Sequence, residues 1–405
     1  MPAGFGGAAT LAGVRVLDLT RYLAGPFCTM LLGDHGADVV KVESPRGREF
    51  RAPGATRDNY FFLSSNRGKR SLVLDLGSAP GRELLLRILP RFDVIVENFR
   101  PGVMEARGLA HEALRSRFPR LIVCGISGFG ADGPYRDRPG FDQIAQGMSG
   151  FMSLTGTAES GPTRAGIAIA DLLAGIFATQ GILLALLERV RSGQGQVVHT
   201  SLLEAMVGVL SWGAGMHFET GAAPGPAGQH HPLSSPYGRF RVGERWLNVA
   251  AGSDAIWERL AGALGHPEWL ADARFGDALA RVRNRDALSG EIETALAGRS
   301  VEHWVLVLNT AGVPAGPVLD VAEVFRDPQV LARRMLVELP HPEVGVFRTT
   351  GLPVKLSRSP GRVVRRPPLH GEHTEEVLLE CGLERAEIEA LRRAGAVGRG
   401  GRGEA

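Results

Sequence analysis

Five short runs of β-branched and aliphatic residues alternate with helical patterns in the first 127 residues, and this alternation most constrains the fold. Each run is short and apolar enough to be a strand buried on both faces. The runs are VRVLDL at 14–19, ADVVKVE at 37–43, KRSLVLDL at 69–76, FDVIVENF at 92–99 and RLIVCGIS at 120–127. Helical patterns lie between them at 26–36, 81–92 and 111–118. We therefore predict βαβ units and an α/β fold with a parallel sheet.

The rest of the chain contains a long apolar helix and then a change in composition. Residues 172–190 are apolar on nearly every face and precede Gly193, which is typical of a core helix with a glycine C-cap. A strand at 196–200 and a capping box of Ser201 and Glu204 follow. The Gly/Pro-rich stretch 221–232 indicates a domain boundary or a loop. We divide the chain into a large part at 1–220, a small domain at 221–320 and a C-terminal part at 321–405, disordered from about 395.

Composition and charge indicate a soluble globular protein. The 405 residues are 44% hydrophobic and 22% charged, near the averages of soluble domains, and the net charge is only +3. Basic residues are spread along the chain, which argues against a nucleic-acid partner. Cys28, Cys124 and Cys381 are odd in number and far apart, so we expect no disulfide framework and a reducing, cytoplasmic location. No signal-peptide or membrane-spanning pattern is found, so we expect no membrane partner.

Several familiar site patterns are present only in part. GFGADG at 128–133 matches GxGxxG, but Pro134 follows and no helix opens there, which disfavours a dinucleotide site. The GxSxG elbow of serine hydrolases is absent from the sequence. His370 and His373 could bind a metal with Glu375, although a loop before a helix explains the three residues equally well. We predict no metal site.

Asp171 ends the apolar segment GIAIAD and stands at the start of the long apolar helix. Because Asp is among the preferred N-cap residues, a structural cap is one interpretation of this residue. The other interpretation is a catalytic carboxylate, and the surrounding motifs favour it.

Seven motifs occur in the order and spacing of one protein family. They are RYLAGP at 21–26, DHGADVVKVE at 34–43, GKRSLVLDL at 68–76, VENFRPGVM at 96–104, SGFGADGP at 127–134, RPGFDQ at 138–143 and AGIAIADLLAG at 165–175. Over about residues 11–380 the chain closely resembles the class III CoA-transferases, and its later segments are most similar to the succinyl-CoA:glutarate branch. The resemblance implies a Rossmann-like large domain built from both chain ends, a smaller inserted α/β domain and an interlocked homodimer.

The resemblance also implies a mechanism in which Asp171 is the nucleophile. Its carboxylate would attack an acyl-CoA thioester, form an acyl-aspartyl anhydride and release the CoA thiolate. An aspartyl-CoA thioester would follow, and an acceptor carboxylate would reverse the sequence and leave with CoA. A helix N-terminus would keep Asp171 ionised and offer backbone donors to the oxyanion. No cofactor would be bound permanently, since the coenzyme A thioester is a substrate.

By the same resemblance, the CoA site would draw on several segments, mostly through backbone groups. Its residues would be Leu23, Ala24, Ser44, Leu74, Asp75, Asn98, Phe99, Arg100, Phe141 and Asp142. Formyl-CoA transferase has Gln in place of Leu23, which argues against oxalate and formyl-CoA as substrates. It has Arg in place of Ser44 and Ala106. Here Arg46 and Arg107 could supply the phosphate contacts, with surface salt bridges as the alternative.

Two further features concern the acceptor acid and a lid. Arg164 precedes the Asp171 segment and could pair with the second carboxylate of a dicarboxylic acid, or be a solvated loop residue. The loop 225–231 matches the place of the family's glycine-rich lid, and its prolines would stiffen it. The roles of His230 and His231 in this loop stay open.

Two other functions deserve comparison with CoA transfer. Alpha-methylacyl-CoA racemase shares this fold and uses a His beside an Asp in a GHD context. The corresponding residues here are Gly140, Phe141 and Asp142, and Phe cannot accept a proton. A non-catalytic acyl-CoA-binding protein would have no need of Asp171. We therefore expect an enzyme that moves CoA from an acyl-CoA such as succinyl-CoA to a free carboxylic acid, with a dicarboxylate favoured.

Overall fold

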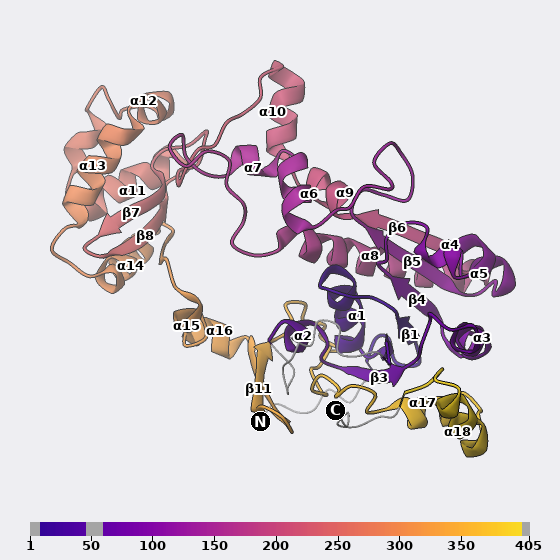
Figure 1. The fold of residues 1–405 in the computed structure, drawn as a ribbon. Coiled ribbons are helices and arrows are strands. Elements are labelled where there is room, and N and C mark those ends of the chain that lie inside the picture. Colours follow the sequence, from indigo (N-terminus) through magenta and orange to yellow (C-terminus); the bar gives the residue numbers. More distant parts are fainter. Residues whose placement is uncertain (1–8, 46–59, 399–405) are drawn as a thin grey trace. The chain divides into compact units, whose positions relative to one another are not determined.

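A computed structural model describes residues 9–45 and 60–398 of the chain, which form two compact units (Figure 1). The first unit contains Met1–Phe151, Ala165–Trp212 and Gln329–Ala405, and the second contains Met152–Arg164 and Gly213–Pro328. The second unit is longer than the small domain predicted at 221–320. The chain leaves the first unit at Trp212, before the Gly/Pro-rich stretch, and the short segment ending at Arg164 also joins the second unit.

A six-stranded parallel sheet forms the centre of the first unit. Its order is β3-β2-β1-β4-β5-β6, with every neighbouring pair parallel. The strands are β1 (Arg15–Asp18), β2 (Asp38–Glu43), β3 (Lys69–Val73), β4 (Val94–Glu97), β5 (Ile122–Ser127) and β6 (Val197–Ser201). This is the strand order of the Rossmann fold, so the predicted fold class is confirmed.

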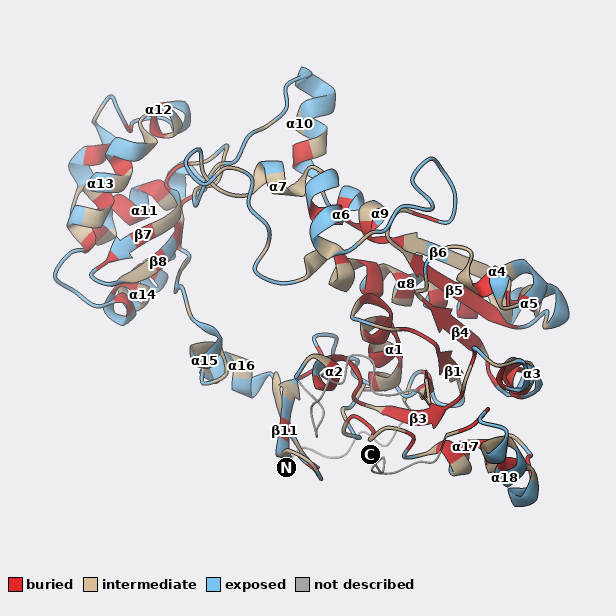
Figure 2. Cartoon of the chain, in the orientation of Figure 1, coloured by how far each residue is buried: buried red, intermediate tan, exposed pale blue. Residues whose placement is uncertain are grey.

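Helices cover both faces of this sheet, because alternate strand residues point to opposite sides. Val16 and Val94 pack into one apolar core, whereas Leu17 and Ile95 pack into the other. The Val16 side carries α1 (Ala24–Asp34), α6 (Asp142–Met148), α8 (Ile169–Ser192) and α9 (Leu202–Gly208). The Leu17 side carries α3 (Ala79–Ile88), α5 (His111–Arg117), α17 (Thr374–Glu380) and α18 (Arg385–Arg393). Figure 2 shows β1, β3, β4 and β5 buried between the helices and β6, at the edge of the sheet, only partly buried.

Shorter elements complete the first unit. They are α2 (Tyr60–Ser65), a 3₁₀ turn at Leu89–Arg91, α4 (Val103–Ala106) and the hairpin of β10 (Leu336–His341) and β11 (Gly345–Thr350). Three further helices lie where the chain passes between the two units: α7 (Phe151–Leu154), α10 (Trp212–Thr220) and α16 (Pro328–Ala332).

The C-terminal segment covers β3, the edge strand of the sheet. Leu74 forms an antiparallel bridge with Val397, and the Asp75 N–H donates to Ala396 O at 2.9 Å. The buried Arg70 guanidinium, on β3, donates to Glu376 and Glu380 of α17 at 2.8 and 2.9 Å. The edge is thereby closed to pairing with another chain.

The second unit has its own core around a three-stranded antiparallel sheet of β7 (Tyr237–Val242), β8 (Arg245–Ala250) and β9 (Ala315–Pro317). Gly243, at φ 60°, turns the predicted hairpin. The helices are α11 (Asp254–Leu264), a 3₁₀ turn at Pro267–Leu270, α12 (Ala278–Arg283), α13 (Arg285–Leu296), α14 (Val301–Thr310) and α15 (Val321–Val324). In the Gly/Pro-rich loop, His231 stacks on Tyr237 with ring centroids 5.0 Å apart.

Candidate functional site

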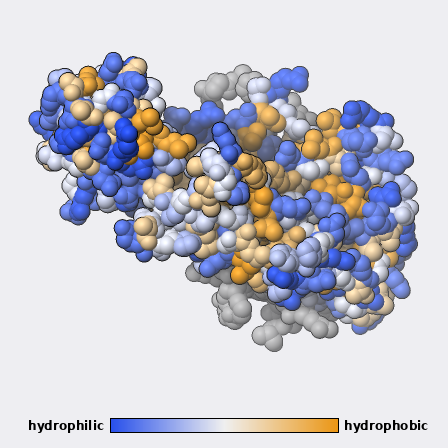
Figure 3. Space-filling view, turned by 90° about the horizontal axis from the view of Figure 1, so that it is seen from above, coloured by the Kyte–Doolittle hydropathy of each residue, from blue (hydrophilic) through white to orange (hydrophobic). Residues whose placement is uncertain are grey.

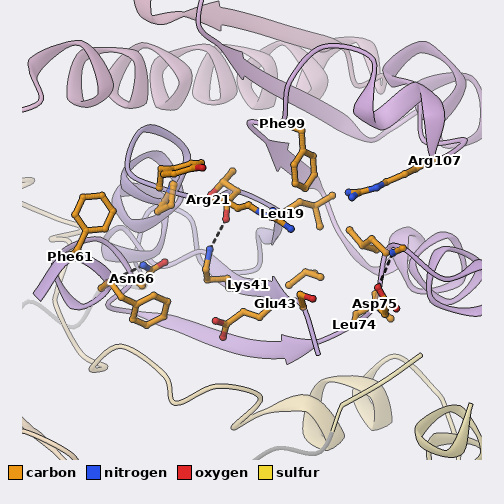
Figure 4. Close-up of a pocket in the computed structure, with 18 residues that line it drawn as sticks. Leu19, Arg21, Lys41, Glu43, Phe61, Asn66, Leu74, Asp75, Phe99 and Arg107 are labelled. Carbon is orange, nitrogen blue, oxygen red and sulfur yellow. Dashed lines mark hydrogen bonds between the residues drawn. The ribbon is translucent and has the colours of Figure 1, made fainter. Parts of the chain in front are cut away.

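The loops that follow β1, β2, β3 and β4 converge at one edge of the sheet, where the strand order reverses. Parallel α/β sheets bind ligands in the crevice at this point. A cavity of about 300 Å³ lies here and receives residues from all four loops (Figure 4). Its lining includes five residues of the predicted CoA site: Ser44, Leu74, Asp75, Phe99 and Arg107.

A buried ionic network forms the floor of this cavity. The fully buried Asp18 carboxylate accepts a hydrogen bond from Lys69 Nζ at 2.9 Å and from Thr29 Oγ1 at 2.7 Å. Lys41, which lines the cavity, has its Nζ 3.9 Å from the same carboxylate and donates to Thr20 O at 2.7 Å. Burial opposes ionisation of Asp18, but the two ammonium groups outweigh it and hold the pKa of Asp18 well below its ordinary value.

One wall of the cavity presents two cations on an aromatic ring. The guanidinium carbons of Arg21 and Arg107 lie 5.3 and 5.0 Å from the centroid of the Phe99 ring. Arg21 is further fixed by Asn98, whose side chain bonds both the N–H and the C=O of Arg21 at 2.7 Å. Guanidinium groups held in this way suit phosphate oxygens and the π-face of a base. Figure 4 shows Arg107 and Phe99 together on one side of the cavity.

Tyr22 connects the cavity to Phe141, the N-cap of α6. It lines the cavity, has φ 62° and contacts the exposed Phe141 ring edge-to-face at 5.7 Å between centroids. A positive φ is uncommon for a bulky residue and often marks a functional loop. Just beyond Tyr22, α1 and α8 approach closely, since a Cβ on Gly175 would lie 2.7 Å from Ala24 O. The predicted residues Leu23 and Ala24 therefore lie beside α8 and not in the cavity lining.

Asp171 lies in the first turn of α8, one turn before Gly175. The helix begins at Ile169 with Ala168 as its N-cap, so the alternative interpretation of Asp171 as the N-cap is wrong. The carboxyl is half-buried, and within 9–45 and 60–398 no donor bonds it. Burial and, secondly, the charge of Asp142 raise the pKa of Asp171 to about 7.

Two expectations about the start of α8 need correction. The first-turn N–H groups of Ile169, Ala170, Asp171 and Leu172 all have acceptors, at Ile167 O, Asp142 Oδ1 (twice) and Ala168 O. They are not free to bind an oxyanion. Burial and the charge of Asp142 also shift the pKa of Asp171 upward, which is opposite to the shift that a helix N-terminus favours.

The remaining predicted contacts are placed as follows. Phe141 and Asp142 stand next to Asp171, at the start of α6. Arg46 lies outside the described residues. Arg100 lines a second cavity, of about 250 Å³, at the ends of β4 and β5. In that cavity Glu97, His111 and His199 crowd over Gly125, where a Cβ would lie 2.8 to 3.1 Å from their side-chain atoms.

The two C-terminal histidines contact the backbone of the sheet. His370 Nε2 lies 3.1 Å from Ser44 O, and His373 Nδ1 accepts from the Ser71 N–H at 3.2 Å. Both contacts hold the chain just before α17 against the sheet. This agrees with the interpretation of the two histidines as part of a loop before a helix.

Comparison with known proteins agrees with this geometry. A family model described as CoA-transferase family III matches residues 11–374. The chain belongs to this family. It is 37% identical over 380 residues to a succinate–glutarate CoA-transferase of Agrobacterium fabrum, which covers 91% of this chain and 95% of that protein. It is 39% identical over 382 residues to a succinyl-CoA:mesaconate CoA-transferase of Haloarcula hispanica, with 91% and 96% covered.

A solved structure shows the same fold. The crystal structure of a CAIB/BAIF family protein from Brucella suis is 37% identical and matches with a TM-score of 0.84, covering 93% of this chain and all of that one. The resemblance inferred from the seven motifs is thus confirmed, and the protein is a family III CoA-transferase.

Several residues that line the cavity were missed by the sequence analysis. Tyr22, Lys41 and Asn66 line the cavity, yet none was selected. Tyr22 follows the predicted strand 14–19, and Lys41 lies within the predicted strand 37–43. These positions could have indicated that both residues line the site. Asn66 precedes β3 and bonds Lys69 Nζ at 2.8 Å, and no sequence pattern indicated that contact.

Proposed function

We propose that this protein transfers CoA from an acyl-CoA of the succinyl-CoA kind to a free dicarboxylate, with Asp171 as the nucleophile. The observation that carries the proposal is a half-buried carboxyl in the first turn of α8, packed on a Rossmann-like sheet, that no donor within residues 9–45 and 60–398 bonds. The named relatives support the substrate class, since they act on succinate and glutarate or on succinyl-CoA and mesaconate.

Each covalent step exchanges one acyl bond for another. An Asp171 oxygen attacks the thioester carbonyl, the C–S bond breaks and the thiolate leaves with the electron pair, giving an anhydride. The thiolate then attacks the aspartyl carbonyl of the anhydride and displaces the donor carboxylate, giving an aspartyl-CoA thioester. The acceptor carboxylate repeats these steps in reverse. A carboxylate nucleophile forms an anhydride with the acyl group. An anhydride retains enough free energy to regenerate a thioester.

The cavity beneath Tyr22 suits the nucleotide end of CoA. Arg21, Arg107 and Lys41 supply positive charge, and the Phe99 ring supplies a π-face for stacking. The proposed contacts at Ser44, Leu74 and Asp75 also line this cavity. Arg46 remains a predicted phosphate contact. In this arrangement the pantetheine arm runs past Tyr22 toward Asp171.

Mass spectrometry after mixing with succinyl-CoA and hydroxylamine tests the proposal, with Asp171→Ala as the control. We expect a hydroxamate on Asp171 alone, together with CoA transfer to at least one dicarboxylate in a panel of free acids. If the protein binds CoA tightly but gives no adduct and no transfer with any donor, it is an acyl-CoA-binding protein and not a transferase.

The raised pKa of Asp171 predicts the pH dependence of the reaction. Attack requires the ionised carboxylate, and the pKa of Asp171 is raised to about 7. We expect kcat/KM to rise with pH, with an apparent pKa near 7 and a plateau above roughly pH 8. The same raised pKa makes the folded state less favourable as pH rises from about 4 to 7, since only the unfolded carboxyl ionises freely there. A flat kcat/KM profile between pH 5 and 8 would contradict the assignment.

Arg164 remains the predicted partner of the second carboxylate of the acceptor. It is exposed and stands one residue before Ala165, whose N–H donates to Gln146 Oε1 at 2.9 Å. We expect Arg164→Ala to raise the KM for glutarate-like acids by about tenfold, the loss of one exposed charge-assisted contact, with little effect on monocarboxylates. Equal effects on the two classes of acid, in steady-state kinetics, would rule this role out.

The racemase alternative lacks a base at the expected position. Phe141 is 55% exposed and contacts Tyr22, and its ring cannot accept a proton. Incubation of an α-methylacyl-CoA in D₂O measures this alternative directly, and we expect no exchange of the α-proton.

We also propose a homodimer, interlocked as in the family, in the cytoplasm. α8 is apolar enough and long enough, at 24 residues, to cross a membrane by length and composition. One of its faces packs on the sheet, but Leu184, Leu187 and Val190 are 57%, 63% and 83% exposed. Figure 3 shows hydrophobic residues exposed among hydrophilic ones on the side where α6 and α9 lie. A second copy would cover such faces, and sedimentation equilibrium would then give twice the chain mass.

A further inference from the structure

Asp142 caps the helix that carries Asp171, although it belongs to another helix. It is the first residue of α6, and its Oδ1 accepts from the Ala170 N–H at 2.8 Å and from the Asp171 N–H at 3.4 Å. The N-cap of α8, Ala168, has no side chain able to satisfy these donors. The carboxylate of Asp142 therefore replaces the missing cap.

Gln146 fixes the second oxygen of the same carboxylate. The fully buried Gln146 side chain donates from Nε2 to Asp142 Oδ2 at 2.6 Å, and its Oε1 accepts from the Ala165 N–H. Both carboxylate oxygens of Asp142 thus have partners within the fold. Gln146 and the N–H groups of Ala170 and Asp171 set the position of these oxygens, so Asp142 is poorly suited to the role of CoA contact that the resemblance implied.

A close approach of two backbones holds α6 in this position. A Cβ on Gly128, after β5, would lie 2.8 Å from the Gly140 Cα, just before α6. A side chain at either position would force α6 and Asp142 away. Gly128, the first glycine of the GFGADG stretch, therefore seats α6 against the end of β5.

Asp142 is the charged group that acts on Asp171. The other charged or titratable side chains on the described elements packed against α8 have partners elsewhere or lie at a distance. They are Asp34 on α1, paired with Arg67; Glu204 on α9, bonded to Ser201; His199 on β6, beside His111; and Glu188, Arg189 and Arg191 near the far end of α8 itself. Two thiols, Cys28 on α1 and Cys124 on β5, are buried, and burial raises the pKa of each, so they are uncharged. In accord with this, Asp142 is the one charged group that shifts the pKa of Asp171.

We propose that Asp142 is a positioning residue for acyl transfer, whose fixed negative charge disfavours the ionised form of Asp171 and so favours the covalent intermediates. This inference rests on the proposed function. When Asp171 attacks the thioester, its negative charge passes to the leaving thiolate, and the anhydride carries none. The aspartyl-CoA thioester is likewise uncharged at Asp171. Repulsion between the two carboxylates is therefore present in the free enzyme and relieved in both intermediates.

Two neutral replacements of Asp142 test the inference. Asp142→Asn keeps an oxygen at the position that accepts from the Ala170 N–H, Asp142→Ser keeps a shorter hydroxyl, and both remove the charge. Rapid-quench mass spectrometry would follow adduct formation on Asp171 against pH. In both variants we expect the pH at which the rate of adduct formation rises to be lower by about one unit. We also expect the fraction of enzyme present as adduct to fall by about tenfold for each pH unit of that shift.

Gln146→Ala is the matched control. It loosens Asp142 but leaves its charge in place, so it should lower the rate without moving the pH at which the rate rises. If the neutral variants show the wild-type pH dependence, or if Gln146→Ala moves it equally, the charge of Asp142 has no such role. If wild-type enzyme forms no adduct on Asp171, the proposed function itself fails. Two neutral variants are used so that a folding defect in one leaves the test intact.

Discussion

Asp171→Asn abolishes CoA transfer if Asp171 is the nucleophile. The amide is a poor nucleophile and cannot form an anhydride, whereas the side-chain shape is nearly unchanged. We expect kcat to fall by at least about 10⁴-fold, the order found when a covalent nucleophile is removed. Steady-state transfer from succinyl-CoA to a dicarboxylate measures the loss, and Kd for CoA should change little because Asp171 lies outside the cavity proposed to bind the nucleotide.

The matched control is Asp286→Asn. Asp286 also lies in the first turn of a helix, α13 of the second unit, and is exposed. Its replacement should leave transfer at the wild-type rate. Retention of more than a few per cent of activity by the Asp171 variant would show that another group carries the acyl chain.

Asp18→Asn should strongly destabilise the first unit. The change removes the anionic partner of Lys69, an ammonium group that is fully buried. Burial lowers the pKa of Lys69 to about 8, and the Asp18 charge opposes that effect. Breaking a buried ion pair typically costs about 3–5 kcal/mol. Because two units need not unfold together, hydrogen exchange of peptides from β1, β2 and β3 is the appropriate measurement.

The effect of Asp18→Asn should also depend on pH. A carboxyl with a lowered pKa contributes stability that is complete above its ordinary pKa of 3.8 and is lost as pH falls toward its folded value. The difference between variant and wild type should therefore shrink below about pH 4. Glu338→Gln, which breaks the exposed Arg348–Glu338 pair of the β10–β11 hairpin, should change nothing measurable. Equal exchange in all three proteins would mean that the buried network contributes no stability.

Much of the fold could be predicted because the sheet residues repeat a local pattern. Six predicted strands appear within about three residues of their expected bounds. Five of them are short apolar runs buried on both faces, and β6 is a partly exposed edge strand. Gly193 ends α8 at φ 74°, and Ser201 caps α9, both as predicted. The exit to the second unit could not be placed because α10 continues the apolar pattern beyond Trp212, where the chain already leaves the first unit.

The candidate site was only partly predictable, because its contacts are made through space. The motif order indicated Asp171, but not that α8 would begin before it and that Asp142 would cap the helix. Likewise, Tyr22 and Phe141 meet across 119 positions of sequence, and neither residue has a local pattern that indicates the contact. Secondary-structure propensity depends on residues that are close in the sequence. Contacts such as that of Tyr22 with Phe141 depend instead on how α1, α6 and α8 pack.

The covering of β3 by the last residues of the chain has a consequence for synthesis on the ribosome. Arg70 is made 306 residues before its partner Glu376. At about 5–20 residues per second, the edge of the sheet waits roughly 15–60 s for the segment that closes it. During that interval a nascent chain exposes an unpaired strand edge and half of an apolar layer. The protein is therefore expected to depend on chaperone protection while it is being made, even though its finished form leaves that edge covered.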